Sequence, residues 1–93
     1  MTDTDRSNDS AFPRIGRVGT GGLLVSFGDS LSEPANRAAL AFRAAVERET
    51  PEGVEETSTS LVSTFLRLDA LHTDPTTVAR AMQTLLDSRD WYG

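Results

Sequence analysis

Cysteine is absent from the 93 residues of this chain, and several kinds of chemistry are excluded with it. Without cysteine there is no disulfide, no thiol nucleophile and no cysteine metal ligand. The absence suits a reducing compartment, and we predict a cytoplasmic location. Histidine is almost as scarce, because His72 is the single one. A lone histidine without a spaced partner does not make a metal site, so we expect His72 in a solvated loop and no bound metal.

Lysine is also missing, and nine scattered arginines stand against fourteen acidic residues, for a net charge of −5. The arginines form no basic stripe, and only 6% of the residues are aromatic, so we expect no nucleic-acid binding. Long apolar runs are lacking too, because the longest run of large aliphatic residues is Leu23-Leu24-Val25. We therefore expect neither a signal peptide nor a membrane span.

The segment from Gly19 to Asp29 is the most informative part of what is present. It reads GTGGLLVSFGD, a glycine-rich turn followed by a short apolar strand. Phosphate-binding loops follow a strand and open a helix, whereas these glycines precede the strand. The dinucleotide pattern G-x-G-x-x-G also fails at Leu24, and no Gly-Lys-Ser/Thr occurs. We interpret the segment as a hairpin turn, and we expect this domain to bind no cofactor.

The pattern of polar and apolar residues divides most of the chain into two regions. Residues 1–12 are expected to form a disordered acidic tail, and residues 13–90 a single α+β domain. Strands are predicted at about 12–18, 23–27, 54–57 and 61–69, and helices at about 33–48 and 75–89, with N-caps at Ser32 and Asp74. The order ββαββα predicts two layers, a four-stranded, mainly antiparallel sheet with both helices on one face.

Periodicity also predicts which side chains face the core. Alternation places Leu23, Val25 and Phe27 on one face of the second strand, with Leu24 and Ser26 opposite. In the last strand, the even-numbered residues from 62 to 68 share a face. The buried helix stripes are predicted to be Ala35, Ala38, Ala39, Phe42, Ala45 and Val46 in the first helix, and Val78, Met82, Leu85 and Leu86 in the second.

Residue types that could support catalysis occur without the spacing that catalysis needs. Ser26 or Ser63 could combine with His72 and Asp69 only on paper, because no G-x-S-x-G elbow is present. The neighbouring carboxylates, at Glu55-Glu56 and around Asp87 and Asp90, are expected in a chain this acidic. We therefore predict no catalytic residue.

Asp29 and Asp69 are the more interesting acids, since each closes a predicted strand. Two interpretations stay open for them. Aspartate at a turn often accepts hydrogen bonds from nearby backbone N–H groups. Alternatively, these carboxylates belong to an interface or a site.

The order of short motifs along residues 14–92 resembles the N-terminal domain of one family, which contains the B component of 5-oxoprolinase, allophanate hydrolase subunit 1 and KipI. That domain opens with a segment like G-D-x-A-L-L-V-x-F-G-D, which Gly19 to Asp29 matches at the same spacing, ending in Gly28 and Asp29. An asparagine early in the first helix is matched by Asn36. A Gly-Val precedes a strand at Gly53-Val54, and a D-W-Y-like exit occupies residues 90–92.

Two further family positions are Ser63 and Asp69, and the chain departs from the family pattern beside both. The stretch that is similar to V-P-A-Y-R-S in the family retains only its last residue, Ser63, and Leu61-Val62 replaces the Tyr-Arg pair. The D-P that follows the strand in the family is here Asp69-Ala70, and Thr20 replaces an aspartate of the opening motif. Any contact that the Tyr-Arg pair makes in relatives is therefore lost.

The resemblance implies a two-layer α+β fold and a carboxyltransferase-type subunit that is not catalytic by itself. It implies a partner of the allophanate hydrolase subunit 2 or KipA type, and a complex that opens 5-oxoproline with ATP, which is used only by the assembled complex. A regulatory alternative is a KipI-like module that inhibits a histidine kinase, and a third is a homo-oligomerising domain. The aromatic residues Trp91 and Tyr92 either fold back on the sheet or are covered by something further. The resemblance implies the latter, because in the family a linker to a cyclophilin-like β-barrel domain begins here. By this resemblance, residues 91–93 are expected to be the start of that linker.

Overall fold

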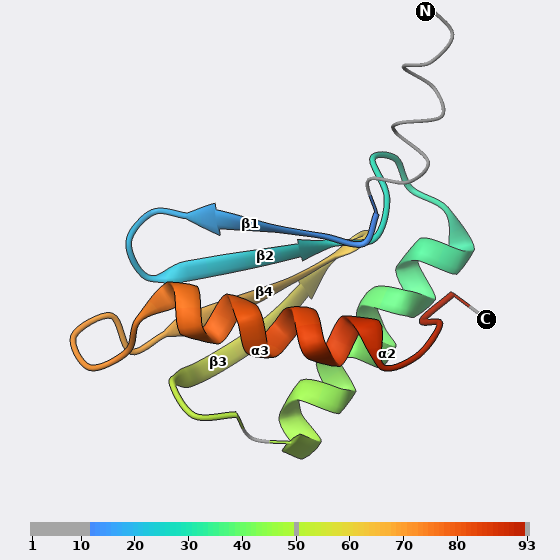
Figure 1. The fold of residues 1–93 in the computed structure, drawn as a ribbon. Coiled ribbons are helices and arrows are strands. Elements are labelled where there is room, and N and C mark those ends of the chain that lie inside the picture. The colour runs from blue at the N-terminus through green and yellow to red at the C-terminus, as the bar shows by residue number, and fades with distance from the viewer. Residues whose placement is uncertain (1–11, 50, 93) are drawn as a thin grey trace, which may run out of the picture.

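The computed structural model describes residues 12–49 and 51–92 and has the predicted α+β architecture (Figure 1). The predicted tail therefore lies, except for Phe12, outside the described residues. In chain order the elements are β1 (Arg14–Val18), β2 (Gly22–Ser26), α2 (Glu33–Glu49), β3 (Val54–Ser60), β4 (Ser63–Leu68) and α3 (Pro75–Asp87).

All neighbouring strands of the sheet are antiparallel, in the order β1-β2-β4-β3. The glycine-rich segment forms the β1–β2 hairpin, as predicted, and Gly19 has a φ of 58° that favours glycine. Gly22 allows a different close approach, because the Phe65 ring lies across its backbone. A Cβ atom built at Gly22 would lie 2.6 Å from that ring.

The boundary between the last two strands differs from the prediction. Strand β3 continues to Ser60, and β4 begins only at Ser63, whereas the sequence predicted a strand from 61 to 69. The reason is a tight turn at Leu61, whose φ of 54° ends the extended backbone. The Ser/Thr-rich run 57–60 nevertheless pairs fully with β4, because β4 supplies a buried partner strand.

The core lies between one face of the sheet and both helices. Leu23, Val25 and Phe27 are buried on that face, as predicted, together with Leu66 and Leu68 of β4. The six predicted residues of α2 are all buried, and their small alanines let this helix lie close to β3 and β4. In α3, Val78, Met82 and Leu86 are buried, but Leu85 is only half-buried, because it lies at the border of the stripe.

Polar groups inside this core are paired. The hydroxyl of the fully buried Thr64 donates to the carbonyl of Ala39 at 2.8 Å, which ties β4 to the middle of α2. The Thr57 hydroxyl donates to the Glu47 carboxylate at 2.8 Å and accepts from Arg43 Nε at 3.1 Å. Among the described residues, no buried side-chain nitrogen or oxygen lacks a partner. The buried polar side chains of the core therefore have their hydrogen-bonding needs met within the domain.

The two aromatic residues near the chain end fold back onto this core, which is the first of the two alternatives and not the one that the resemblance implied. Trp91 is only 7% exposed, and its indole N–H donates to the Leu86 carbonyl at 3.0 Å. Its ring meets Phe42 edge-on, with centroids 5.2 Å apart. The Tyr92 hydroxyl donates to the Phe27 carbonyl at 2.8 Å, and burial, with a smaller effect of Asp90, raises the pKa of this phenol. Residues 91 and 92 thus pack as part of this domain.

Candidate functional site

The family-motif positions fall at opposite ends of the sheet. Strands β2 and β4 are antiparallel and pair Ser26 with Ser63, so the end of β2 lies beside the start of β4. Gly28, Asp29, Asn36 and Ser63 therefore gather around one end of the sheet, and Asp69 lies at the other. We call the first group the β2-exit cluster, and we describe its members in turn.

Asn36 holds the turn between β3 and β4. Its side-chain amide donates to the Leu61 carbonyl at 2.6 Å, across 25 positions of sequence. The next carbonyl of the turn, that of Val62, accepts from the backbone N–H of Phe27 at 2.9 Å. The turn holds a leucine in the left-handed region, which costs a residue with a Cβ atom about 1 kcal/mol. Asn36 thus links α2 to a strained turn, which is a structural role.

Ser63 and Gly28 are also occupied by the fold. The Ser63 hydroxyl lies 3.1 Å from that of Ser26 on the paired strand. A Cβ atom at Gly28 would approach the Cβ of Ala35 to 3.3 Å, so glycine lets the loop after β2 lie close to α2. Both residues therefore help to join β2, β4 and the first turn of α2.

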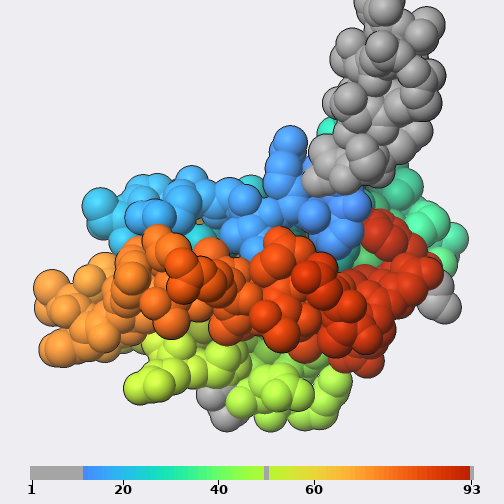
Figure 2. Space-filling view, in the orientation of Figure 1, coloured from blue at the N-terminus to red at the C-terminus, as the bar shows by residue number. Residues whose placement is uncertain are grey.

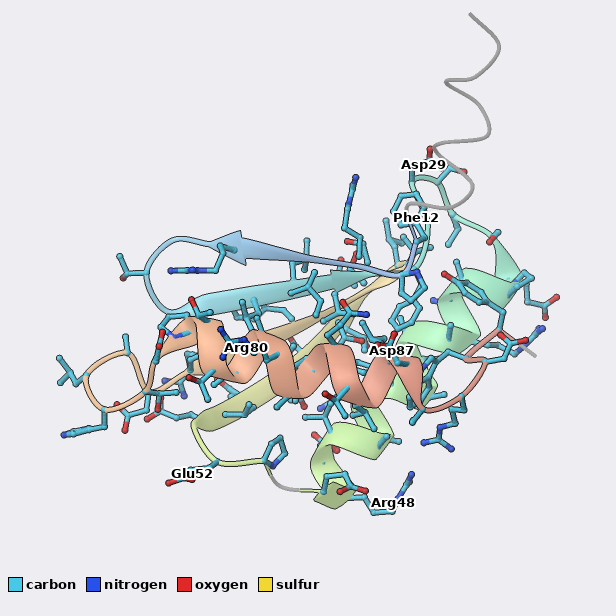
Figure 3. All side chains as sticks on the ribbon, in the orientation of Figure 1. Phe12, Asp29, Arg48, Glu52, Arg80 and Asp87 are labelled. Atoms are coloured by element: carbon cyan, nitrogen blue, oxygen red, sulfur yellow. The ribbon has the colours of Figure 1, made fainter. Side chains whose placement is uncertain are left out.

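Asp29 is the exception within the β2-exit cluster. Its side chain is exposed on the loop after β2, near Phe12 (Figure 3). No hydrogen bond from Asp29 to another described residue is present, so the turn-capping interpretation has no support here. Its carboxylate is open to solvent.

Asp69 does make the hydrogen bonds typical of an aspartate at a turn. Its Oδ1 accepts from the backbone N–H of Leu71 at 3.3 Å, and its Oδ2 lies 3.0 Å from His72 Nδ1. The hydrogen bond to His72 is the largest effect that holds the pKa of Asp69 below its ordinary value. His72 is in a loop and mostly exposed, as the sequence predicted.

The structure separates the residues of the Ser-His-Asp combination. Ser63 begins β4, whereas Asp69 and His72 follow its end. The length of this strand keeps the serine roughly 17 Å from the carboxylate–imidazole pair. Within residues 12–49 and 51–92, no group of three metal-ligating side chains is present either. Neither a triad nor a metal centre forms among these residues.

The acidic pairs are likewise bound to neighbouring groups. A bulge in β3 lets Glu55 and Glu56 both reach Arg67 of β4, with N–O distances of 2.8 and 3.0 Å. Asp87 accepts from the Gln83 amide, and Asp90 accepts from the backbone N–H of Tyr92. Each of these four carboxylates thus has a partner within the domain.

Comparison with known proteins accounts for the spacing of these motifs. The sequence profile of the family described as "Carboxyltransferase domain, subdomain C and D" matches residues 13–91. The chain belongs to this family. Such carboxyltransferase subdomains are found in proteins of the 5-oxoprolinase B-component and allophanate hydrolase subunit 1 family, so the resemblance seen in the sequence is confirmed.

A solved structure supports the fold of this carboxyltransferase subdomain. The crystal structure of a conserved uncharacterized protein from Pyrococcus horikoshii is similar to it, with a TM-score of 0.72 and 28% sequence identity. The similarity covers 77% of the present chain and 33% of the archaeal chain, so the present chain matches about a third of that relative's length. No curated protein matches the sequence significantly.

Sequence reasoning missed the links that give the motif positions their roles. Neither the bond from Asn36 to the Leu61 carbonyl nor the Ser26–Ser63 contact was predicted, since each depends on the pairing of β2 with β4. No local signal in the sequence marks the first link, because it ends on a backbone carbonyl of a turn that leucine rarely forms. No helix in the described part of the carboxyltransferase subdomain is long and apolar enough to cross a membrane.

Proposed function

We propose that this chain is the N-terminal scaffold and interface domain of a cytoplasmic protein that resembles the B component of 5-oxoprolinase. In this proposal it acts with a subunit of the allophanate hydrolase subunit 2 or KipA type in ATP-dependent hydrolysis of 5-oxoproline. The observation that carries the proposal is the family match over residues 13–91. ATP belongs to the assembled complex, and the domain binds no cofactor.

The geometry of the motif positions supports a scaffold role over a catalytic one. The hydrogen bonds of Asn36 and Ser63 and the close contact of Gly28 are all made within the domain. These contacts give each of the three residues a role in holding the domain together. Asp29 is the member of the β2-exit cluster with a carboxylate that faces solvent, so it is the motif residue best placed to contact a partner.

Reconstitution tests the proposal. The chain is purified alone, with a tagged subunit 2-like protein, and with that protein plus the ATP-using subunit, and 5-oxoproline hydrolysis is measured in each mixture. We expect a stable pair with the subunit 2-like protein and turnover only in the complete mixture. Turnover by the chain alone would contradict the scaffold role. Recovery of a histidine kinase, with no binding of the subunit 2-like protein, would favour the regulatory alternative.

A matched pair of variants locates the interface. Asp29→Asn removes the exposed charge of the β2-exit cluster, and Glu52→Gln removes an exposed charge elsewhere on the domain (Figure 3). We expect both variants to keep wild-type stability, because exposed substitutions usually change it by less than about 0.5 kcal/mol. Only Asp29→Asn is expected to weaken binding of the partner. Equal effects of the two variants would remove Asp29 from the interface.

A further inference from the structure

Strand β1 and helix α3 border a shallow, open groove of about 350 Å³ on the helix side of the sheet. Figure 2 shows the two elements in contact along this face, with β1 in blue and α3 in orange. We call this feature the β1–α3 groove. It is lined by Ile15, Arg17, Thr76, Ala79, Arg80 and Gln83.

The charge of the β1–α3 groove is opposite to that of the chain. Its lining holds two arginines and no acidic residue, although the chain carries a net charge of −5. Three other depressions on the surface are each lined by at least one carboxylate. Within the described ranges, neither Arg17 nor Arg80 forms an ion pair, whereas Arg37, Arg43 and Arg67 each do.

The remaining lining gives the groove a mixed chemical character. Ile15 and Ala79 are half-buried and pack against the core, so they give the groove an apolar floor. Thr76 and Gln83 add polar rims. A ligand that fits must therefore bring both an apolar side chain and a negative charge.

Strand β1 adds backbone recognition, because it is an outer strand of the sheet. Alternate N–H and C=O groups of an edge strand point away from the sheet and can pair with a further strand. Among the described residues no strand pairs with this outer edge of β1, so a further strand can add there.

We propose that the β1–α3 groove docks an extended acidic segment of a partner protein, which adds to β1 as a fifth strand and places a carboxylate between Arg17 and Arg80. Ile15 and Arg17 are two positions apart and share one face of β1. The docked strand must match this period, so its apolar and acidic side chains are also two positions apart. The partner strand is thus recognised by three successive positions: an apolar residue, a residue of any type, and an acidic residue.

An alternative explanation of the arginines is protection of the sheet edge. Charged side chains on outer strands prevent one sheet from pairing with another. This alternative predicts self-association when the charges are removed, and no binding of an added strand.

The proposal rests on the proposed function only in assigning the domain a protein-binding role. Peptide binding tests the groove and reconstitution tests the function, so either can fail alone.

The test is a titration of the ¹⁵N-labelled chain, observed by amide chemical shifts, with a synthetic peptide that repeats Val-Thr-Glu-Thr. We expect shift changes in β1 and in the facing turns of α3, and weaker binding as salt is added. Arg17→Gln and Arg80→Gln are each expected to weaken binding about 1.5-fold to fivefold, the range for exposed ion pairs. Arg48→Gln is the matched control, since Arg48 is exposed at the end of α2, away from Arg80 (Figure 3).

Three altered probes separate the parts of the proposal. A peptide with glutamine in place of glutamate is expected to bind more weakly, and one that is N-methylated at alternate amides is expected not to bind. If the glutamine peptide bound as tightly as the original peptide, the charge contact would be overturned. If the N-methylated peptide bound as tightly, the strand addition would be overturned. Equal weakening by Arg48→Gln, or the absence of any shift in β1, would overturn the groove as the docking site. Binding that appears only after residues 1–11 are removed would assign the groove to the chain's own acidic segment and overturn the partner.

Discussion

Replacement of Trp91 by alanine tests whether the C-terminal aromatics belong to the domain or begin a linker. Burying an aromatic side chain removes roughly 200 Å² from water, which at about 25 cal/mol per Å² amounts to about 5 kcal/mol. The hydrogen bond from the indole N–H to the Leu86 carbonyl adds about 1 kcal/mol. Relaxation of the nearby chain end recovers part of this, so we expect Trp91→Ala to cost about 3–5 kcal/mol, the usual range for large aromatic truncations.

Such a loss is a large fraction of the stability of so small a domain. At about 0.05–0.15 kcal/mol per residue, roughly 80 ordered residues give only about 4–12 kcal/mol. The measurement is urea unfolding followed by far-ultraviolet circular dichroism, because Trp91 is the single tryptophan and its fluorescence is lost in the variant. Leu71→Ala is the control, since Leu71 is 89% exposed. If Trp91→Ala, or removal of residues 91–93, cost no more than Leu71→Ala, the packing argument would be refuted.

Three further predictions concern the turns and the strand ends. Asn36→Ala is expected to lower the free energy of unfolding by about 0.5–1.5 kcal/mol, because a hydrogen bond to the β3–β4 turn is lost. Amide hydrogen exchange in that turn is expected to become faster, and an unchanged exchange rate there would contradict the role of Asn36. Gly53→Ala is expected to cost about 1–3 kcal/mol, because Gly53 has a φ of 92° and a Cβ atom would lie 2.5 Å from the Thr73 methyl group. Adding Thr73→Ala should recover only part of this loss in urea unfolding, and full recovery would show that the backbone is unstrained. For Asp69, a pKa held below 3.8 by His72 means that the ionised carboxylate stabilises the folded chain, and that this contribution is lost as the pH falls through the folded-state pKa. The stability gap between wild type and Asp69→Asn should therefore be present above about pH 4 and close below it, and a gap that widened in acid would exclude this linkage.

Local rules predicted most of the elements because their signals are short-range. The apolar stripe of α2 follows the helical period without a break, and Asp74 accepts from the Thr76 N–H at 3.0 Å as an N-cap should. The turn at Leu61 was missed because leucine rarely adopts a positive φ, and the alternation of the strand continues through it. Tertiary contacts, not local preference, decide that conformation.

The arrangement of the polar groups could not be read from the sequence in the same way. The strand order β1-β2-β4-β3 inserts β4 beside β2, and this pairing brings Ser63 to Ser26. Likewise, Arg17 and Arg80 line one groove only because α3 returns to pack near β1. Contacts between elements distant in sequence carry no periodic signal in a single chain.

The family motif is therefore mostly a signature of the fold, which explains why it survives beside departures. Asn36 bonds to a backbone carbonyl, and that bond is indifferent to the side chain that the turn residue carries. Leucine can therefore stand at position 61 without loss of this link. The Gly28 contact and the Ser63 hydroxyl contact also lie within the domain. Leu61 is 64% exposed, so a different side chain at this position would alter the surface of the turn and leave this internal bond in place.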